Sequence, residues 1–288
     1  NTMAVTDPIY PVYIDSNVMG GRAGVFENGR WSNVTYMSCS EENKFVPQIP
    51  DHRVDMVYLC YPNNPTGMVI TKEELQKWVD YALAHNAIIF YDAAYEAYIQ
   101  DDDIPHSIYE IPNAKKVAIE FHSYSKTAGF TGIRCGYTII PKELTATTKD
   151  GKCVEVAQFW DRRQCTKFNG TSYISQRAAE AIYTQEGKKQ IKQTIDYYME
   201  NARILRESLT ELGLTVYGGE NAPYLWVKTP ADTPSWKFFE EMLNGAQVVC
   251  TPGVGFGLAG EGFIRITSFG DRNDCIEAMA RIKKWLNK

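Results

Sequence analysis

The chain has 288 residues, of which 44% are hydrophobic and 23% charged, and its formal net charge is -5 at pH 7. This composition is typical of a globular protein with one large domain or two smaller ones. The charge disfavours nucleic acid or an anionic membrane surface as the main partner, and no apolar run reaches the roughly 18–20 residues that span a bilayer. The seven cysteines are scattered without a C-x-x-C pair. They predict no metal site and no disulfide framework, and they favour a reducing, cytoplasmic setting.

The chain begins with NTMAVTDPIYPVYID, a segment that is typical of a strand running into a turn. No capping residue or tail precedes this segment, so we expect the chain to start within a larger fold. Further along, four runs of apolar, β-branched or aromatic residues predict buried strands. These runs span residues 56–60, 87–91, 117–121 and 136–140.

A helix is predicted between the first two of these strands. Thr71 and Glu74 form a T-x-x-E capping box, which marks the start of a helix. The apolar residues that follow have helical spacing and define one face. They are Leu75, Trp78, Val79, Ala82 and Leu83. Strand, helix and strand form a βαβ unit, whose right-handed crossover places the strands parallel in a sheet covered by helices. We therefore expect an α/β domain over residues 1–186, with a polar inserted loop at 145–153.

The remaining residues, 187–288, have a different pattern. The predicted elements are a helix over about 186–212, strands in LTVYGG and PYLWVKTP, a helix over 234–243, a strand in FIRITSF and a helix over 274–287. The last helix carries Cys275, Met279, Ile282 and Leu286 on one face. Helices that alternate with antiparallel strands indicate a smaller α+β domain. The expected fold class is thus α/β, with a mostly parallel sheet in the large domain and a smaller C-terminal α+β domain.

Polar side chains follow three of the predicted parallel strands at the points where the strands end. The segments YPNNPTG, DAAYEAY and HSYSK supply Asn64, Asp92, Tyr95, Ser123, Ser125 and Lys126. Ligands of open parallel sheets bind beyond the carboxyl ends of the strands, so we expect these side chains to face one crevice. Each signal alone has a plainer explanation, since Asp92 suits a helix cap, N-N-P-T-G a turn and Lys126 a surface charge.

Pyridoxal phosphate (PLP) is a cofactor whose chemistry requires this set of groups. It needs a lysine for its Schiff base and a carboxylate against the pyridinium nitrogen, which keeps the ring protonated as an electron sink. Asp92 suits the ring nitrogen, and Asn64 and Tyr95 suit the phenolate oxygen. The phosphate needs an anion site, for which hydroxyls and a forked guanidinium are suited. The candidates for that anion site are Ser123, Ser125 and Arg134.

The order and approximate spacing of YPNNPTG, DAAY and SYSKTAGFTGIRCGY resemble the fold-type-I, aspartate-aminotransferase-like enzymes, which depend on PLP. The resemblance runs along all 288 residues. Within that family the chain looks like the LL-diaminopimelate aminotransferases. The segments that carry this finer likeness are DPIYPVYIDSNVMGG, WDRRQCTKFNGTSYISQ, ENAPYLWVKTP and FIRITSFG.

The resemblance implies roles for five residues. Lys126 would form the Schiff base and then move the proton at the substrate Cα, and Tyr10 would stack on the cofactor ring. Arg265 would clamp the substrate α-carboxylate together with Asn64, and Asn169 would reach the site of a neighbouring subunit. The alternatives are a core tyrosine at position 10, a structural salt bridge at position 265 and a turn asparagine at position 169.

The implied activity is the transfer of an amino group from LL-2,6-diaminopimelate to 2-oxoglutarate, in lysine biosynthesis, by a ping-pong mechanism in a homodimer with shared active sites. An aspartate or aromatic amino acid aminotransferase is the alternative within the family. Two further alternatives are a catalytically silent regulator domain and a PLP C–S lyase or synthase on the same scaffold. The family also carries more chain before the D-P-x-Y tyrosine, including a phosphate-binding loop. We therefore expect an N-terminally truncated chain whose own activity is not predicted.

Overall fold

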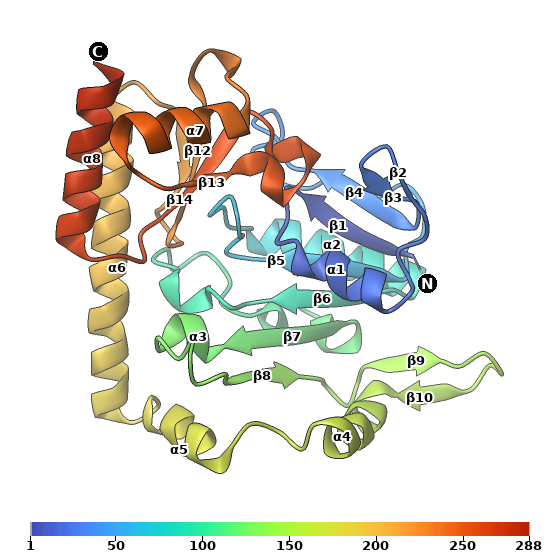
Figure 1. The fold of residues 1–288 in the computed structure, drawn as a ribbon. Helices are drawn as coiled ribbons and strands as arrows, with labels where there is room; N and C mark the ends of the chain where they lie inside the picture. Colours follow the sequence, from blue (N-terminus) through green and yellow to red (C-terminus); the bar gives the residue numbers. More distant parts are fainter. Residues whose placement is uncertain (1, 288) are drawn as a thin grey trace.

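The larger of two main sheets carries the N-terminal half of the chain. The structure, a computed structural model, describes residues 2–287. The six strands follow the order β4-β1-β5-β6-β7-β8, and all neighbours are parallel except β7 and β8 (Figure 1). The bounds are β1 Met3–Asp7, β4 Val34–Ser38, β5 Met56–Cys60, β6 Ile88–Asp92, β7 Ala118–Ser123 and β8 Gly136–Ile139. All four predicted strands are therefore present.

One of these strands differs from the prediction. The sequence analysis predicted a buried strand over 136–140, but Gly136, Tyr137 and Ile139 are exposed in β8. The reason is its place in the sheet, because β8 is the last strand in the order and pairs on one side only, antiparallel to β7. A strand at the edge of a sheet leaves one side of its backbone and much of its side-chain surface uncovered.

The predicted helix between β5 and β6 is present as α2, Lys72–His85, with its capping box. The Glu74 amide donates to the Thr71 hydroxyl at 3.2 Å, and the Thr71 amide donates to the Glu74 carboxylate at 3.0 Å. Leu83, which was expected on the buried face, is 40% exposed instead. Tyr81 is buried instead, and its hydroxyl donates to the backbone oxygen of His52 in the segment before β5.

Several elements of the N-terminal half were not predicted. The turn after β1 continues into α1, Val12–Met19, and a small hairpin follows with β2 Phe26–Glu27 and β3 Arg30–Trp31. Residues 145–153 were expected as a loop but contribute a hairpin, β9 Thr145–Thr147 and β10 Cys153–Glu155, whose turn is closed by the Lys152 amide donating to Thr148 Oγ1. Helices α3 Tyr124–Thr127, α4 Val156–Lys167 and α5 Tyr173–Ala181 complete this half.

The second main sheet lies in the C-terminal part and has four antiparallel strands in the order β11-β12-β14-β13. The bounds are α6 Gln185–Glu211, β11 Val216–Gly218, β12 Tyr224–Lys228, α7 Ser235–Ala246, β13 Thr251–Pro252, β14 Phe263–Thr267 and α8 Arg272–Leu286. Short 3-10 helices lie at Glu96–Tyr98, Ile108–Glu110, Ala114–Lys116, Pro230–Asp232, Gly253–Phe256 and Leu258–Gly260. The predicted helices and strands of this part are present, and β13 is an addition.

Helices α6, α7 and α8 gather around the second sheet (Figure 1), and a separate apolar core joins them to it. It includes Leu205 of α6, Phe238 and Met242 of α7, Ile264 of β14 and Ile282 of α8. The larger sheet has its own core around α2. Two further apolar clusters join the two parts, one with Phe45 and Trp226 and one with Tyr95 and Tyr224. The domain boundary near residue 186 therefore stays a prediction.

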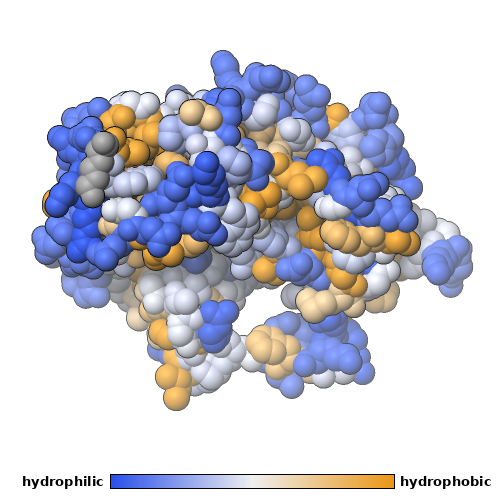
Figure 2. Space-filling model, turned by 45° about the horizontal axis from the view of Figure 1, so that its top comes forward, coloured by the Kyte–Doolittle hydropathy of each residue, from blue (hydrophilic) through white to orange (hydrophobic). Residues whose placement is uncertain are grey.

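The surface is mixed in character, and Figure 2 shows hydrophobic residues in separate patches interrupted by hydrophilic ones. The part of the chain with α4 and α5 carries several exposed large apolar side chains. They are Phe159, Trp160, Phe168, Tyr173, Ile174 and Tyr183. Within residues 2–287, none of the helices combines the length and apolar character required for a membrane span.

Candidate active site

A cavity of about 550 Å³ lies where the carboxyl ends of β5, β6 and β7 face the second sheet. Nine of the ten predicted site residues line it. They are Tyr10, Asn64, Asp92, Tyr95, Ser123, Ser125, Lys126, Arg134 and Arg265. The predicted crevice at the strand ends is thus a single cavity, and the second sheet supplies its other wall.

Asn169 is the predicted residue that lies elsewhere. It is exposed, has φ of +66° and lines a different cavity of about 770 Å³ next to Gly170 and Phe168. Arg134 lines both cavities, so the two adjoin at that arginine. The expectation that Asn169 serves a neighbouring subunit stays a prediction.

Lys126 lies on the short helix α3, directly after β7. The Ser123 hydroxyl accepts a hydrogen bond from the Ser125 amide at the start of this helix, and the carbonyl oxygen of Lys126 accepts one from the Tyr98 hydroxyl at 2.9 Å. Burial lowers the pKa of the Lys126 amine, and the positive charges of Arg265 and Arg134 lower it further, whereas Asp92 opposes them. A lysine with a lowered pKa more readily provides the neutral amine that a nucleophile or a base requires.

Asp92 lies at the end of β6 and is held at both oxygens. The Ala94 amide donates to one oxygen at 3.0 Å, and the Tyr13 hydroxyl donates to the other. Burial raises the pKa of Asp92, and these hydrogen bonds together with the charges of His122 and Lys126 act against that rise. A carboxylate that is buried at the edge of a cavity is best stabilised by a cationic partner, and a protonated ring nitrogen is such a partner.

Arg265 is the clearest sign that an anion belongs in the cavity. Its Nη1 donates to the Asn64 side-chain oxygen at 2.6 Å, and its Nε is buried without a hydrogen-bond partner. Among residues 2–287 no carboxylate lies within ion-pair distance of this guanidinium. Burial lowers the pKa of Arg265, as expected for a cation that lacks a counter-charge. A buried, unpaired guanidinium is costly, so its geometry suits a bidentate carboxylate that arrives from solution.

The anion site predicted for a phosphate lies on another part of the cavity wall. Ser123 and Ser125 offer two hydroxyls, and Arg134 adds a permanent positive charge. The Arg134 guanidinium is anchored by one hydrogen bond, from Nη1 to the Thr131 carbonyl oxygen at 2.6 Å. The remaining N–H groups of Arg134 are available to a phosphate. The residues present therefore fit PLP, because the cavity offers an anion site for its phosphate, a carboxylate for its ring nitrogen and an amine for its Schiff base.

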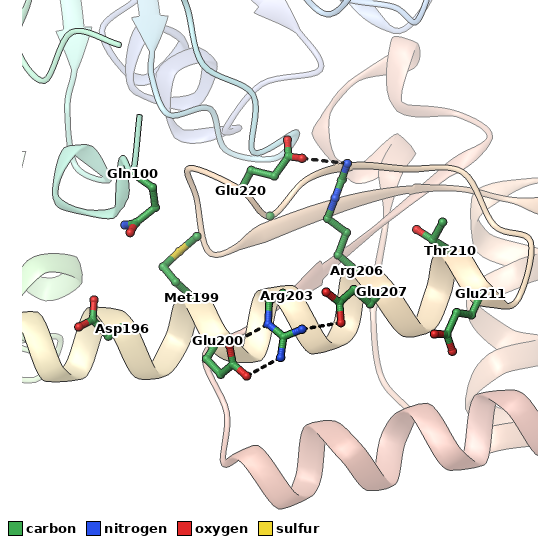
Figure 3. A pocket seen from close by; sticks show the side chains of 11 residues that line it. Gln100, Asp196, Met199, Glu200, Arg203, Arg206, Glu207, Thr210, Glu211 and Glu220 are labelled. Atoms are coloured by element: carbon green, nitrogen blue, oxygen red, sulfur yellow. Dashed lines mark hydrogen bonds and ion pairs between the residues drawn. The ribbon is translucent and has the colours of Figure 1, made fainter. Parts of the chain in front are cut away.

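A larger cavity of about 800 Å³ along α6 has a different character (Figure 3). Arg203 donates to the carboxylates of Glu200 and Glu207, and Arg206 pairs with Glu220. Both arginines therefore already have protein partners. Unlike Arg265, they leave no unsatisfied cation for a ligand, so the functional site belongs to the smaller cavity.

Seven residues of the cavity wall were not predicted as site residues, and three of them have ring side chains with polar groups: Tyr13, His122 and Tyr224. Tyr13 follows Tyr10 by three residues, and that spacing at the start of a helix was a usable signal. His122 Nε2 donates to the Glu120 carboxylate at 2.6 Å, and the His122 ring stacks on Tyr137. The sequence around Tyr224 predicted only a strand and no role in the site.

Comparison with known proteins agrees with this geometry. Residues 35–282 match the family model of aminotransferase class I and II. The chain is 70% identical over 286 residues to an LL-diaminopimelate aminotransferase of Phocaeicola vulgatus, a match that covers 99% of this chain and 70% of the relative. It is also 70% identical over 288 residues to an LL-diaminopimelate aminotransferase of Bacteroides thetaiotaomicron, again with 99% and 70% coverage.

Among solved structures, the L,L-diaminopimelate aminotransferase from Chlamydomonas reinhardtii is similar, with a TM-score of 0.92 and 45% identity. The match covers 98% of this chain and 69% of that one. The fold is therefore that of the fold-type-I aminotransferases, a mostly parallel sheet with an added antiparallel sheet. The chain belongs to the class I and II aminotransferases, a family that uses PLP. Within this family it resembles the LL-diaminopimelate aminotransferases named above and spans about 70% of their length.

Proposed function

We propose that this chain transfers an amino group from LL-2,6-diaminopimelate to 2-oxoglutarate. The amino group appears in glutamate, and the remaining oxo acid closes to tetrahydrodipicolinate with loss of water. The identity of about 70% to LL-diaminopimelate aminotransferases over nearly the whole chain supports this substrate, and it supports a place in lysine biosynthesis. The unpaired Arg265 guanidinium supports a substrate that carries a carboxylate.

We assign the roles of the cavity residues as follows. When bound, PLP supplies an electron sink for the carbanion that forms when the substrate Cα loses its proton. The Lys126 amine forms the covalent link to the cofactor and moves the proton at the substrate Cα. Asp92 keeps the proton on the ring nitrogen, and Tyr10 packs against the ring. Arg265 holds the substrate α-carboxylate.

The remaining roles concern binding. Asn64 and Tyr95 donate to the phenolate oxygen, and Asn64 also positions Arg265 through the hydrogen bond at 2.6 Å. Ser123, Ser125 and Arg134 hold the phosphate. The arrangement is suited to two half-reactions in turn, because both the amino acid and the oxo acid present the same α-carboxylate to Arg265.

We further propose a homodimer with shared active sites, a division at about residue 186 into two domains and a cytoplasmic location. The exposed apolar side chains around α4 and α5 support an interface there, since patches of this kind mark contact surfaces. Asn169 lies next to them. The seven cysteines are free, which supports a reducing compartment.

The visible absorbance of the purified protein with added PLP tests the proposal. We expect an absorption band that depends on Lys126, is bleached by LL-diaminopimelate and returns with 2-oxoglutarate. Lys126→Ala should lack the band, whereas Lys167→Ala, an exposed lysine on α4, should keep it. Absence of a Lys126-dependent band in the wild-type protein would contradict the proposed activity.

A second assay separates the alternative aminotransferases. Glutamate formation from 2-oxoglutarate is measured with LL-diaminopimelate, aspartate and an aromatic amino acid as donors. The proposal expects LL-diaminopimelate to be the best donor. A clear preference for aspartate or the aromatic donor would leave the aminotransferase reaction in place and overturn the substrate.

A further inference from the structure

Tyr224 is a residue of the cavity wall that touches both ends of the site. It lies on β12 of the second sheet and is only 5% exposed. Its hydroxyl lies 2.7 Å from the Tyr95 hydroxyl, and its ring centroid lies 4.4 Å from the guanidinium carbon of Arg265. Tyr224 therefore contacts one residue assigned to the cofactor and one assigned to the substrate.

The structure allows either hydroxyl to donate the hydrogen bond that joins the two tyrosines. Each tyrosine has one O–H hydrogen and so donates one hydrogen bond. In the proposed function Tyr95 gives its hydrogen to the phenolate oxygen of the cofactor, so it cannot also donate to Tyr224. With the cofactor bound, Tyr224 therefore donates to Tyr95, and the hydrogen of Tyr95 points into the cavity.

The ring of Tyr224 holds the guanidinium of Arg265 in place. The rings of Tyr224 and Phe256 lie 4.4 and 4.7 Å from the guanidinium carbon, and Asn64 accepts from one terminal nitrogen. A cation on aromatic faces is stabilised without its N–H groups being used. The buried Nε of Arg265 therefore stays available to a carboxylate.

The backbone of Tyr224 is also fixed against the loop that carries Asn64. A Cβ atom on residue 67 would lie 2.3 Å from the Tyr224 carbonyl oxygen, and the backbone of Gly67 has φ of +68°. Both features require glycine at this position of the N-P-T-G segment. The loop can therefore pack directly onto β12, and Tyr224 cannot shift without moving Asn64.

We propose that Tyr224 is a positioning residue that couples the cofactor end of the site to its carboxylate end. Its hydroxyl directs the hydrogen of Tyr95 toward the phenolate oxygen of the cofactor, and its ring orients Arg265 for the substrate carboxylate. The inference rests on the proposed aminotransferase function and on the roles of Tyr95 and Arg265 within it.

Two substitutions separate the hydroxyl from the ring. Tyr224→Phe removes the hydroxyl and keeps the ring, whereas Tyr224→Leu removes both. Tyr81→Phe is the matched control, because it deletes another buried tyrosine hydroxyl, which donates to the His52 carbonyl oxygen and does not line the cavity.

The first measurement follows the visible absorbance of the PLP-loaded protein as a function of pH. The pH at which the change in absorbance is half complete is the pH midpoint. A hydroxyl donates more strongly when its own oxygen accepts a hydrogen bond, so loss of the Tyr224 hydroxyl weakens Tyr95 as a donor. The phenolate oxygen of the cofactor is then less stabilised, so the proton beside it on the Schiff-base nitrogen is lost only at a higher pH. We expect the midpoint to rise in Tyr224→Phe and Tyr224→Leu and to stay unchanged in Tyr81→Phe.

The second measurement is the dissociation constant of glutarate, a plain dicarboxylate, by titration calorimetry. Loss of the ring in Tyr224→Leu should weaken glutarate binding about fivefold, whereas Tyr224→Phe should stay within about twofold of the wild type. If Tyr224 had only a structural role, the variants would unfold at a lower temperature. Tyr224→Phe would then not change the pH midpoint while keeping the affinity for glutarate.

The outcomes are distinct. Equal pH midpoints in the wild type and Tyr224→Phe overturn the role of the hydroxyl, and equal glutarate affinities in the wild type and Tyr224→Leu overturn the role of the ring. A wild-type protein without a Lys126-dependent band would overturn the proposed function itself, and that result is seen before any Tyr224 variant is compared.

Discussion

The basicity of Lys126 is set by burial and by the charges that share its cavity. After burial, the largest influence that lowers its pKa is the positive charge of Arg265. Removal of that charge in Arg265→Gln should let the amine hold its proton to a higher pH, so the pKa of Lys126 should rise toward its ordinary value. The pH dependence of Lys126 labelling by a small amine-reactive reagent, resolved by mass spectrometry, measures this shift.

Arg281→Gln is a suitable control for this experiment, because Arg281 lies on α8 and pairs with Glu277 at the surface. The labelling midpoint of Lys126 should not change in that variant. If Arg265→Gln also left the midpoint unchanged, burial alone would account for the lowered pKa of Lys126. The role of Arg265 as a neighbouring charge would then be wrong.

The site residues also show which positions of the cavity the sequence could predict and which it could not. Nine of ten predicted site residues line one cavity, because lysine, aspartate and arginine at strand ends are chemically conspicuous. Tyr13 and Tyr224 were not predicted, since a tyrosine in an apolar context is most often a core residue. Contacts that join distant parts of the chain distinguish them, such as Tyr224 with Tyr95 and Tyr13 with Asp92.

At the scale of elements, the capping box of α2 is a signal whose energetic weight can be tested. The Thr71 hydroxyl accepts from the Glu74 amide, and this satisfies one of the free amides at the helix start. Thr71→Ala should therefore destabilise the protein by about 1 kcal/mol and lower the melting temperature by about 2–4 °C. Thermal unfolding followed by circular dichroism measures the change.

Thr194→Ala provides the contrast within the same chain. Thr194 is exposed in the middle of α6, where alanine is the better helix former, so stability should stay the same or rise slightly. A similar loss of stability in both variants would show that the capping interaction of Thr71 carries no special weight.

Elements with strong local signals were predicted well, and elements whose form depends on their neighbours were not. The central strands β5 and β6 are nearly continuous apolar runs because helices and neighbouring strands cover them, whereas β7 also contains the buried Glu120. The exposure of β8 depends on which strand lies beside it, and this cannot be deduced from its own residues. The short hairpin of β9 and β10 likewise arises from a turn in a polar segment that resembles a loop.

At the scale of the whole molecule, the cavity exists only while the two sheets keep their relative position. Several polar contacts join them besides those within the cavity. The Asp7 carboxylate accepts from the Ala259 amide at 3.1 Å. Glycine suits position 257 because its φ is +129°, which L side chains rarely adopt, and because a Cβ would lie 2.2 Å from the same oxygen. Glu41 provides a second contact, since it accepts from both Tyr217 and Lys228 of the second sheet.

The Glu41 contact makes a prediction about pH. Although partial burial acts to raise the pKa of Glu41, hydrogen bonds from Lys228 and Tyr217 lower it below the ordinary value of 4.5. The unfolded chain therefore binds a proton at a higher pH than the folded chain does. The stabilisation is complete above about pH 4.5 and is lost as the pH falls through the lower folded-state pKa.

Glu41→Gln removes this charge and keeps the shape of the side chain. At pH 7 the variant should have a slightly lower urea midpoint than the wild type. The difference should shrink as the pH falls below 4.5, where Glu41 of the unfolded chain takes up a proton, and should vanish below the lower folded-state pKa. Glu277→Gln on α8 is the control, because its ion pair with Arg281 lies within one helix and does not join the sheets. A difference that stays constant with pH would mean that Glu41 acts through packing rather than charge. A larger glutarate dissociation constant in Glu41→Gln, but not in Glu277→Gln, would further show that this contact keeps Arg265 facing the cavity.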